Sequence, residues 1–139
     1  MRFLTPIMIS VIIATGGCVH TGADADVMSS KDDKYIITEI GEPINCIMSS
    51  NIRSTEVIDN QTIDFKMNNG DIYRNNLPNK CPGLTFEQSF SYRTSINQLC
   101  NVDIIKPLDS TAGRLETRGA CGLGKFQKIE KIKRTEAED

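Results

Sequence analysis

Residues 62 to 75 read TIDFKMNNGDIYRN, and this stretch decides the fold class. Polar and apolar residues alternate through its first six positions, which places Ile63, Phe65 and Met67 on one face of a strand. The Asn-Asn-Gly that follows is the strongest short hairpin signal in the chain, and a second strand-like segment comes directly after it. The stretch therefore predicts a β-hairpin with one buried face.

The register of this hairpin depends on the length of its turn. A two-residue turn sets Ile72 across from Met67, whereas a three-residue turn, with Gly70 in the left-handed region, sets Tyr73 across from Phe65. We favour the longer turn because it pairs two aromatic side chains on the buried face.

The rest of the chain from Tyr35 onward, which we call the body, shows short strand-like segments with turn signals about every 8 to 12 residues. This pattern predicts a mainly β domain, with α+β as the open alternative. We expect a small antiparallel sheet, or a partly closed barrel or sandwich, with one short helix within residues 44–54. Near the end, Phe126, Ile129 and Ile132 lie three apart, a helical spacing that competes with a strand over residues 124–132.

The first residues of the chain differ in composition from the body. The chain opens MRFLTPIMISVIIATGGC, with one Arg, twelve mostly apolar residues at 3–14, and then small residues. Twelve residues are too few for a membrane-spanning helix, which needs roughly 20. The order of basic, apolar and small residues is typical of a secretory signal peptide, which we assign to residues 1–17.

Two cleavage sites fit this leader. Thr15-Gly16-Gly17-Cys18 resembles a bacterial lipobox, with Thr15 where such boxes usually carry Leu. Ala23-Asp24-Ala25 is an A-x-A site for ordinary signal peptidase. We favour the lipobox because it directly follows the apolar run.

Lipidation of Cys18 would place the protein in the periplasm, attached to a membrane by its N-terminal lipid alone. Residues 18–34 would then form a flexible tether, residues 35–132 one β-rich domain, and residues 133–139 a charged tail.

Four cysteines remain in the body: Cys46, Cys81, Cys100 and Cys121. They lie 35, 19 and 21 positions apart, so the C-x-x-C spacing of paired zinc ligands and of thioredoxin-like redox sites is missing. An exported protein meets an oxidising compartment, where four cysteines indicate two disulfides. A domain of about 100 residues without Trp has a thin core and needs such cross-links. Of three possible pairings we predict Cys81 with Cys100, which brackets a hairpin-sized segment, and Cys46 with Cys121, which ties the ends of the domain.

The cysteines and their neighbours resemble a family of small exported bacterial envelope proteins that is catalogued only as a domain of unknown function. The similarity covers residues 46–129, and its pattern includes C-I, C-P-G-L, L-C and C-x-L-G-x-F, which begin at Cys46, Cys81, Leu99 and Cys121. Of these, C-P-G-L and C-x-L-G-x-F are distinctive in combination. The resemblance implies an exported, often lipobox-bearing protein with four paired cysteines. It brings no activity, substrate or catalytic residue.

Several chemistries are disfavoured by what the body lacks. The only histidine is His20, outside the body, so a Ser-His-Asp or Cys-His mechanism and a histidine-based zinc site have no residue to use. The net charge of -2, with basic and acidic residues intermixed, predicts no nucleic-acid partner. We identify no catalytic residue, no metal ligand and no cofactor.

Two groups of charged residues in the body are candidate sites. Two carboxylates could cooperate in a histidine-independent hydrolase; the alternative is that Asp59 caps a turn and Asp64 lies on a solvent face. Basic residues could converge as an anion site or belong to a solvated, mixed-charge surface, and we favour the second. The residues concerned are Asp59, Asp64, Asp71 and Asp103, and Arg53, Arg74, Lys80 and Arg93.

These observations favour a noncatalytic domain that binds an envelope protein or polymer, or that serves structurally. The alternatives are the hydrolase just described and a cytosolic metal domain with four thiolate ligands, so whether the protein is an enzyme stays open, with the balance against it.

Overall fold

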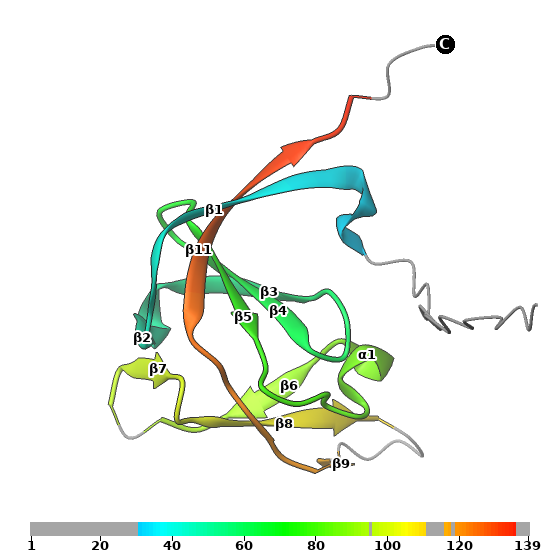
Figure 1. The fold of residues 1–139 in the computed structure, drawn as a ribbon. Coiled ribbons are helices and arrows are strands. Elements are labelled where there is room, and N and C mark those ends of the chain that lie inside the picture. The colour runs from blue at the N-terminus through cyan, green and yellow to red at the C-terminus, as the bar shows by residue number, and fades with distance from the viewer. Residues whose placement is uncertain (1–30, 95, 111–115, 118, 136–139) are drawn as a thin grey trace, which may run out of the picture.

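The computed structural model describes residues 31–94, 96–110, 116–117 and 119–135 (Figure 1). The predicted signal peptide, the lipidation site Cys18, the A-x-A site and most of the tether lie outside these residues. The last four residues assigned to the tether form a short 3-10 helix, η1 (Lys31–Lys34). Among the described residues, no helix is long and apolar enough to cross a membrane.

The main layer is a five-stranded antiparallel sheet in the order β1-β11-β5-β4-β3. Its strands are β1 (Tyr35–Ile44), β3 (Ile52–Val57), β4 (Thr62–Met67), β5 (Ile72–Asn76) and β11 (Phe126–Lys133). The expected mainly β, disulfide-stapled domain with antiparallel sheets is confirmed, and the sheets do not close into a barrel. The helical spacing near the C-terminus does not give a helix, because β11 pairs with strands on both sides.

The hairpin that opened the sequence is β4 and β5, and its predicted register is confirmed. Phe65 lies directly opposite Tyr73. Gly70 has a φ of 90°, in the left-handed region that a three-residue turn requires. The backbone N–H of Met67 donates to the carbonyl of Asp71 at 2.8 Å, which closes the turn.

A smaller sheet lies against the main one at the bottom of Figure 1. It consists of β6 (Phe90–Tyr92), β8 (Ile104–Asp109), β9 (Glu116–Thr117) and β10 (Cys121–Gly122), with β8 in the centre. A two-stranded ribbon, β2 (Cys46–Met48) with β7 (Gln98–Cys100), stands beside it. The only α-helix of the described residues is one turn long, α1 (Leu84–Glu87).

The helix expected within residues 44–54 is wrong. These residues form the end of β1, then β2, the 3-10 turn η2 (Ser49–Asn51) and the start of β3. Ile47 is buried and lies opposite Leu99 in the β2–β7 ribbon, and both side chains belong to the core. Tertiary pairing therefore decides the conformation of this segment.

The hydrophobic core fills the space between the two sheets. Phe65 is its centre, since its ring meets those of Phe126 and Phe90 edge to face at centroid distances of 5.5 and 6.1 Å. Such pairs contribute about 0.5–1.5 kcal/mol beyond the burial of their area. The other buried members are Ile47, Val57, Ile63, Met67, Leu77, Cys81, Leu84, Leu99, Ile105 and Leu123.

All four body cysteines are paired, but the predicted pairing is wrong. The bridges are Cys46–Cys100 and Cys81–Cys121. Cys46 and Cys100 lie directly opposite each other in the β2–β7 ribbon, with their Cα atoms 4.0 Å apart. Cys81 lies in the loop that follows β5, and Cys121 lies in β10, so the second bridge joins that loop to the small sheet.

Gly124 occupies a position that no other residue fits. The buried side chain of Asn75 donates to the Gly124 carbonyl at 2.6 Å and accepts from its N–H at 2.8 Å. A Cβ atom at Gly124 would overlap the carbonyl oxygen of Asn76.

Gly124→Ala is therefore expected to lower the free energy of unfolding by about 1–3 kcal/mol, the usual cost of overpacking. Gly122→Ala is the matched control, because a Cβ there meets nothing within 4 Å. Urea unfolding of both variants checks this. Equal losses would show that the close approach to Asn76 carries no strain.

Candidate functional site

The carboxylate of Asp64 is fully buried, so its predicted place on a solvent face is wrong. Asp64 does point away from the core, as the alternation along β4 requires. Arg74 lies directly opposite it on β5. The guanidinium donates to both carboxylate oxygens, Nε at 2.8 Å and Nη2 at 2.9 Å. A bidentate pair of this kind is specific in geometry and strong.

Further charged groups complete an ion-pair network on this outer face of the main sheet. Asp32 of η1 binds Arg74 at 2.7 Å. Lys131 of β11 contacts the carboxylate of Asp64 and lies 3.7 Å from that of Asp32. The full ion-pair network comprises Asp32, Glu56, Asp64, Lys66, Arg74 and Lys131.

The network contains three carboxylates and three cations, so its formal charge is balanced. Burial alone would lower the pKa of Arg74, but its hydrogen bonds with Asp64 and Asp32 raise that pKa well above the ordinary value. Asp64 is fully buried and both of its carboxylate oxygens are held by cations, so it is not exposed to a substrate. The ion-pair network therefore fixes η1 on the sheet, a structural role.

Glu56 makes stability depend on pH at the edge of this network. A hydrogen bond from Lys66, at 2.9 Å, and the charge of Lys131 hold the pKa of Glu56 below its ordinary 4.5. A lowered native pKa contributes stability above pH 4.5 that is lost as the pH falls below it.

We therefore expect Glu56→Gln to be less stable than wild type at pH 7, by an amount that shrinks as the pH falls from 4.5 towards 3. Urea unfolding of both proteins at pH 7, 4.5 and 3 measures the difference. A difference that stays constant over this range would contradict ionisation as its cause.

The other predicted carboxylates also have structural partners. Asp59 accepts from the N–H of Gln61 at 2.7 Å, which confirms the predicted turn cap. Asp103 accepts from the N–H of Cys100 at 2.7 Å, and Asp71 pairs with Lys128 at 2.9 Å. Each of these contacts uses the carboxylate to hold the chain.

The predicted cations do not form one site. Arg74 belongs to the ion-pair network, whereas Arg93 lines a pocket on the small sheet. Arg53 and Lys80 are exposed and belong to neither. The alternative of a convergent four-cation site is therefore wrong.

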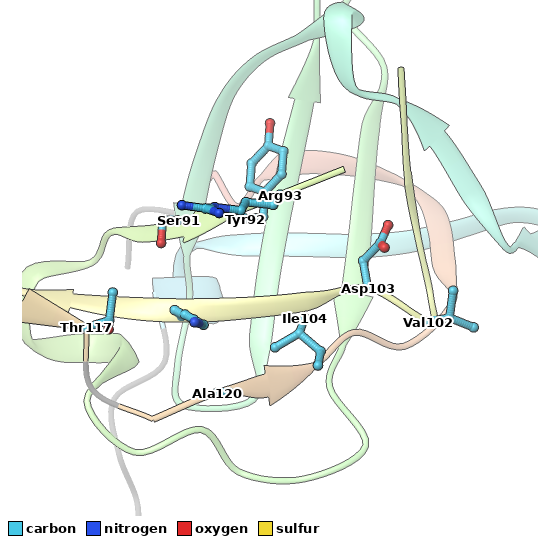
Figure 2. Close-up of a pocket in the computed structure, with 9 residues that line it drawn as sticks. Ser91, Tyr92, Arg93, Val102, Asp103, Ile104, Thr117 and Ala120 are labelled. Atoms are coloured by element: carbon cyan, nitrogen blue, oxygen red, sulfur yellow. The ribbon is translucent and has the colours of Figure 1, made fainter. Parts of the chain in front are cut away.

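A pocket lies on the outer face of the small sheet (Figure 2). Its volume is about 680 Å³, within the usual range for small-molecule sites. Along β6 and β8, alternate side chains face the core, so the others face the pocket. The lining residues are Ser91, Tyr92, Arg93, Val102, Asp103, Ile104, Lys106, Thr117 and Ala120.

Apolar and cationic groups lie together in this pocket. Val102 and Ile104 are 81% and 54% exposed. Lys106 of β8 lies directly opposite Ser91 of β6. Arg93 comes two residues after Ser91 and so lies on the same face of the sheet. Among the described residues, no carboxylate forms an ion pair with Arg93 or Lys106.

Of the lining residues, the sequence singled out only Arg93 and Asp103, and it did not indicate that the two share a pocket. The alternation in β8 was available as a signal, since Ile104 and Lys106 alternate with the buried Ile105 and Pro107. The other contributing strands, β6 and β9, have three and two residues and give no periodic pattern. The pocket could therefore not be assembled from the sequence.

Comparison with known proteins found no matching family model, no matching curated protein and no matching solved structure. The resemblance to small envelope proteins stays a prediction. The four-thiolate metal site is excluded in this structure, because all four body sulfurs are in disulfides. Among the residues that the structure describes, no group of three or more His, Cys, Asp or Glu side chains is placed to hold a metal ion.

Proposed function

We propose that this protein is an exported, noncatalytic binding domain of the bacterial envelope, held in the periplasm by a lipid on Cys18. The observation that carries the proposal is the pairing of all four body cysteines. Disulfides persist in oxidising compartments and are rare where thiols are kept reduced. The leader-like residues 1–17 support the same compartment.

The binding role is supported by the way the charged groups are used. The carboxylates weighed for a hydrolase hold cations or backbone N–H groups, and the folded body has no histidine. The pocket on the small sheet, in contrast, offers two cations that have no ion-pair partner in the part of the chain that the structure describes, beside exposed apolar side chains. A surface of this composition favours binding, with an envelope protein or polymer as the general class of partner.

Intact mass spectrometry of the protein from the membrane fraction tests export, lipidation and oxidation together. The expected species begins at a lipidated Cys18 and gains mass on reduction, because each disulfide takes up two hydrogens. Cys18→Ser is the matched control and should lose attachment to the membrane. An unprocessed Met1 or four free body thiols would overturn the proposal. A mature chain that begins at Asp26 would remove the lipid but leave the export.

A further inference from the structure

We propose that the pocket on the small sheet binds an anionic amphiphile, a molecule in which a phosphate or carboxylate group is joined to an alkyl chain. This inference rests on the proposed binding function and goes beyond it, since it adds a small amphiphilic ligand to the envelope protein or polymer proposed above. Two features of the pocket carry it, a pair of cations and an apolar surface that begins beside them.

The cations provide the anion-binding half. Continuing the β6–β8 register by one residue sets Arg93 across from Ile104, so Arg93 and Lys106 are diagonal neighbours on one face. Like charges at neighbouring positions repel, and no ion pair among the described residues offsets this. A bound anion would remove the repulsion. The planar guanidinium of Arg suits two-point recognition of a phosphate or carboxylate, and Lys adds a point charge.

The acid in the pocket lining does not compete for these cations. The Asp103 carboxylate accepts the N–H of Cys100 at 2.7 Å. Figure 2 shows this carboxylate and the side chain of Ile104 on opposite sides of the strand. The hydroxyl of Ser91, directly opposite Lys106, remains as a neutral donor beside the cations.

The apolar half starts at Ile104 and Val102 and extends beyond the pocket. A second pocket of about 350 Å³ shares Ala120 with the first and is lined by Phe86 and Pro82. The Phe86 side chain is 85% exposed. An alkyl chain lying along this surface would remove its apolar groups from water, which favours binding in proportion to the area covered.

The two halves together select the ligand. A free inorganic anion would use the cations and leave the apolar side chains in water. An uncharged detergent would cover the apolar side chains and leave the cations repelling each other. Only a ligand with an anionic head and an alkyl chain uses both.

Calorimetric titration of the disulfide-bonded protein with dodecyl phosphate, below its micellar concentration, tests the proposal. We expect saturable binding that is at least tenfold tighter than binding of inorganic phosphate or of the uncharged dodecyl maltoside. Arg93→Gln and Lys106→Gln should each weaken it roughly tenfold, the effect of losing one charge-assisted hydrogen bond. Ile104→Ser should weaken dodecyl phosphate binding but not the binding of inorganic phosphate.

Arg53→Gln is the matched control, because Arg53 is an exposed cation outside the pocket. This variant should bind dodecyl phosphate with the affinity of the wild type. Unchanged urea midpoints establish that the variants fold. Absence of saturable binding overturns the proposal, as does equal affinity for inorganic phosphate or for the maltoside. A lipidated, oxidised protein that binds no dodecyl phosphate would remove this inference alone. An unprocessed protein with free thiols would remove the proposed function instead.

Discussion

Replacing Asp64 with Asn is expected to lower the free energy of unfolding by about 3–5 kcal/mol, the cost of removing one partner from a buried ion pair. The Asp64 side chain is 0% exposed, and those of Arg74 and Lys131 are only 13% and 10% exposed. Without the carboxylate, the two cations remain desolvated and face each other with too little negative charge. Urea unfolding at pH 7 measures the loss.

The loss would be a large fraction of the total, since domains are usually stable by about 5–15 kcal/mol. Asp71→Asn is the matched control, because it breaks the Lys128–Asp71 pair between side chains that are much more exposed. Water and salt weaken such pairs, so the control should lose far less stability. If both variants lost the same amount, burial would not be the source of the effect.

Removing the Cys81–Cys121 bridge, by replacing both cysteines with Ala, should cost about 4 kcal/mol through the greater freedom of the unfolded chain. The bridge spans 40 positions, and Cys81 is fully buried in the core. Loss of its buried sulfur adds to the entropic cost, because a cavity remains in the packing. Thermal and urea unfolding of the oxidised protein measure the change.

The double variant Cys46→Ala, Cys100→Ala provides the comparison. Its bridge spans 54 positions, a similar loop, but Cys46 and Cys100 are only half-buried and their strands are already paired. We expect a smaller loss than for the buried bridge. Peptide mapping without reduction checks the pairing itself. A fragment that joins Cys81 to Cys100 would contradict the structure and both stability expectations.

The β4–β5 hairpin shows which features the sequence predicts well. Its alternation, its glycine turn and even its register follow from residues that are close together in the chain. The pairing of the cysteines depends instead on β2 and β7, which have three residues each and are distant in sequence. Strands this short carry no periodic signal. The hairpin-sized spacing between Cys81 and Cys100 therefore wrongly indicated that these two cysteines pair.

Asp64 shows the same limit at the level of a single side chain. Alternation along β4 correctly placed it on the face opposite the core. Whether that face meets water is decided by Asp32 and Lys131, which come from the two ends of the described chain. The pocket on the small sheet was missed for a similar reason, since its lining residues come from three separate strands, β6, β8 and β9, and from the loops next to them.

The pairing of β1 with β11 determines how this domain would respond to tension. Tyr35 lies opposite Lys133, and the N–H of Arg134 donates to the carbonyl of Lys34 at 2.9 Å. The two ends of the domain therefore leave the main sheet side by side (Figure 1). A pull between them would separate β1 from β11 one residue pair at a time, the geometry in which paired strands resist least. The contact between Asp32 and Arg74 would be among the first to carry that load. The ion-pair network would therefore also hold the N-terminal end of the domain on the sheet under tension.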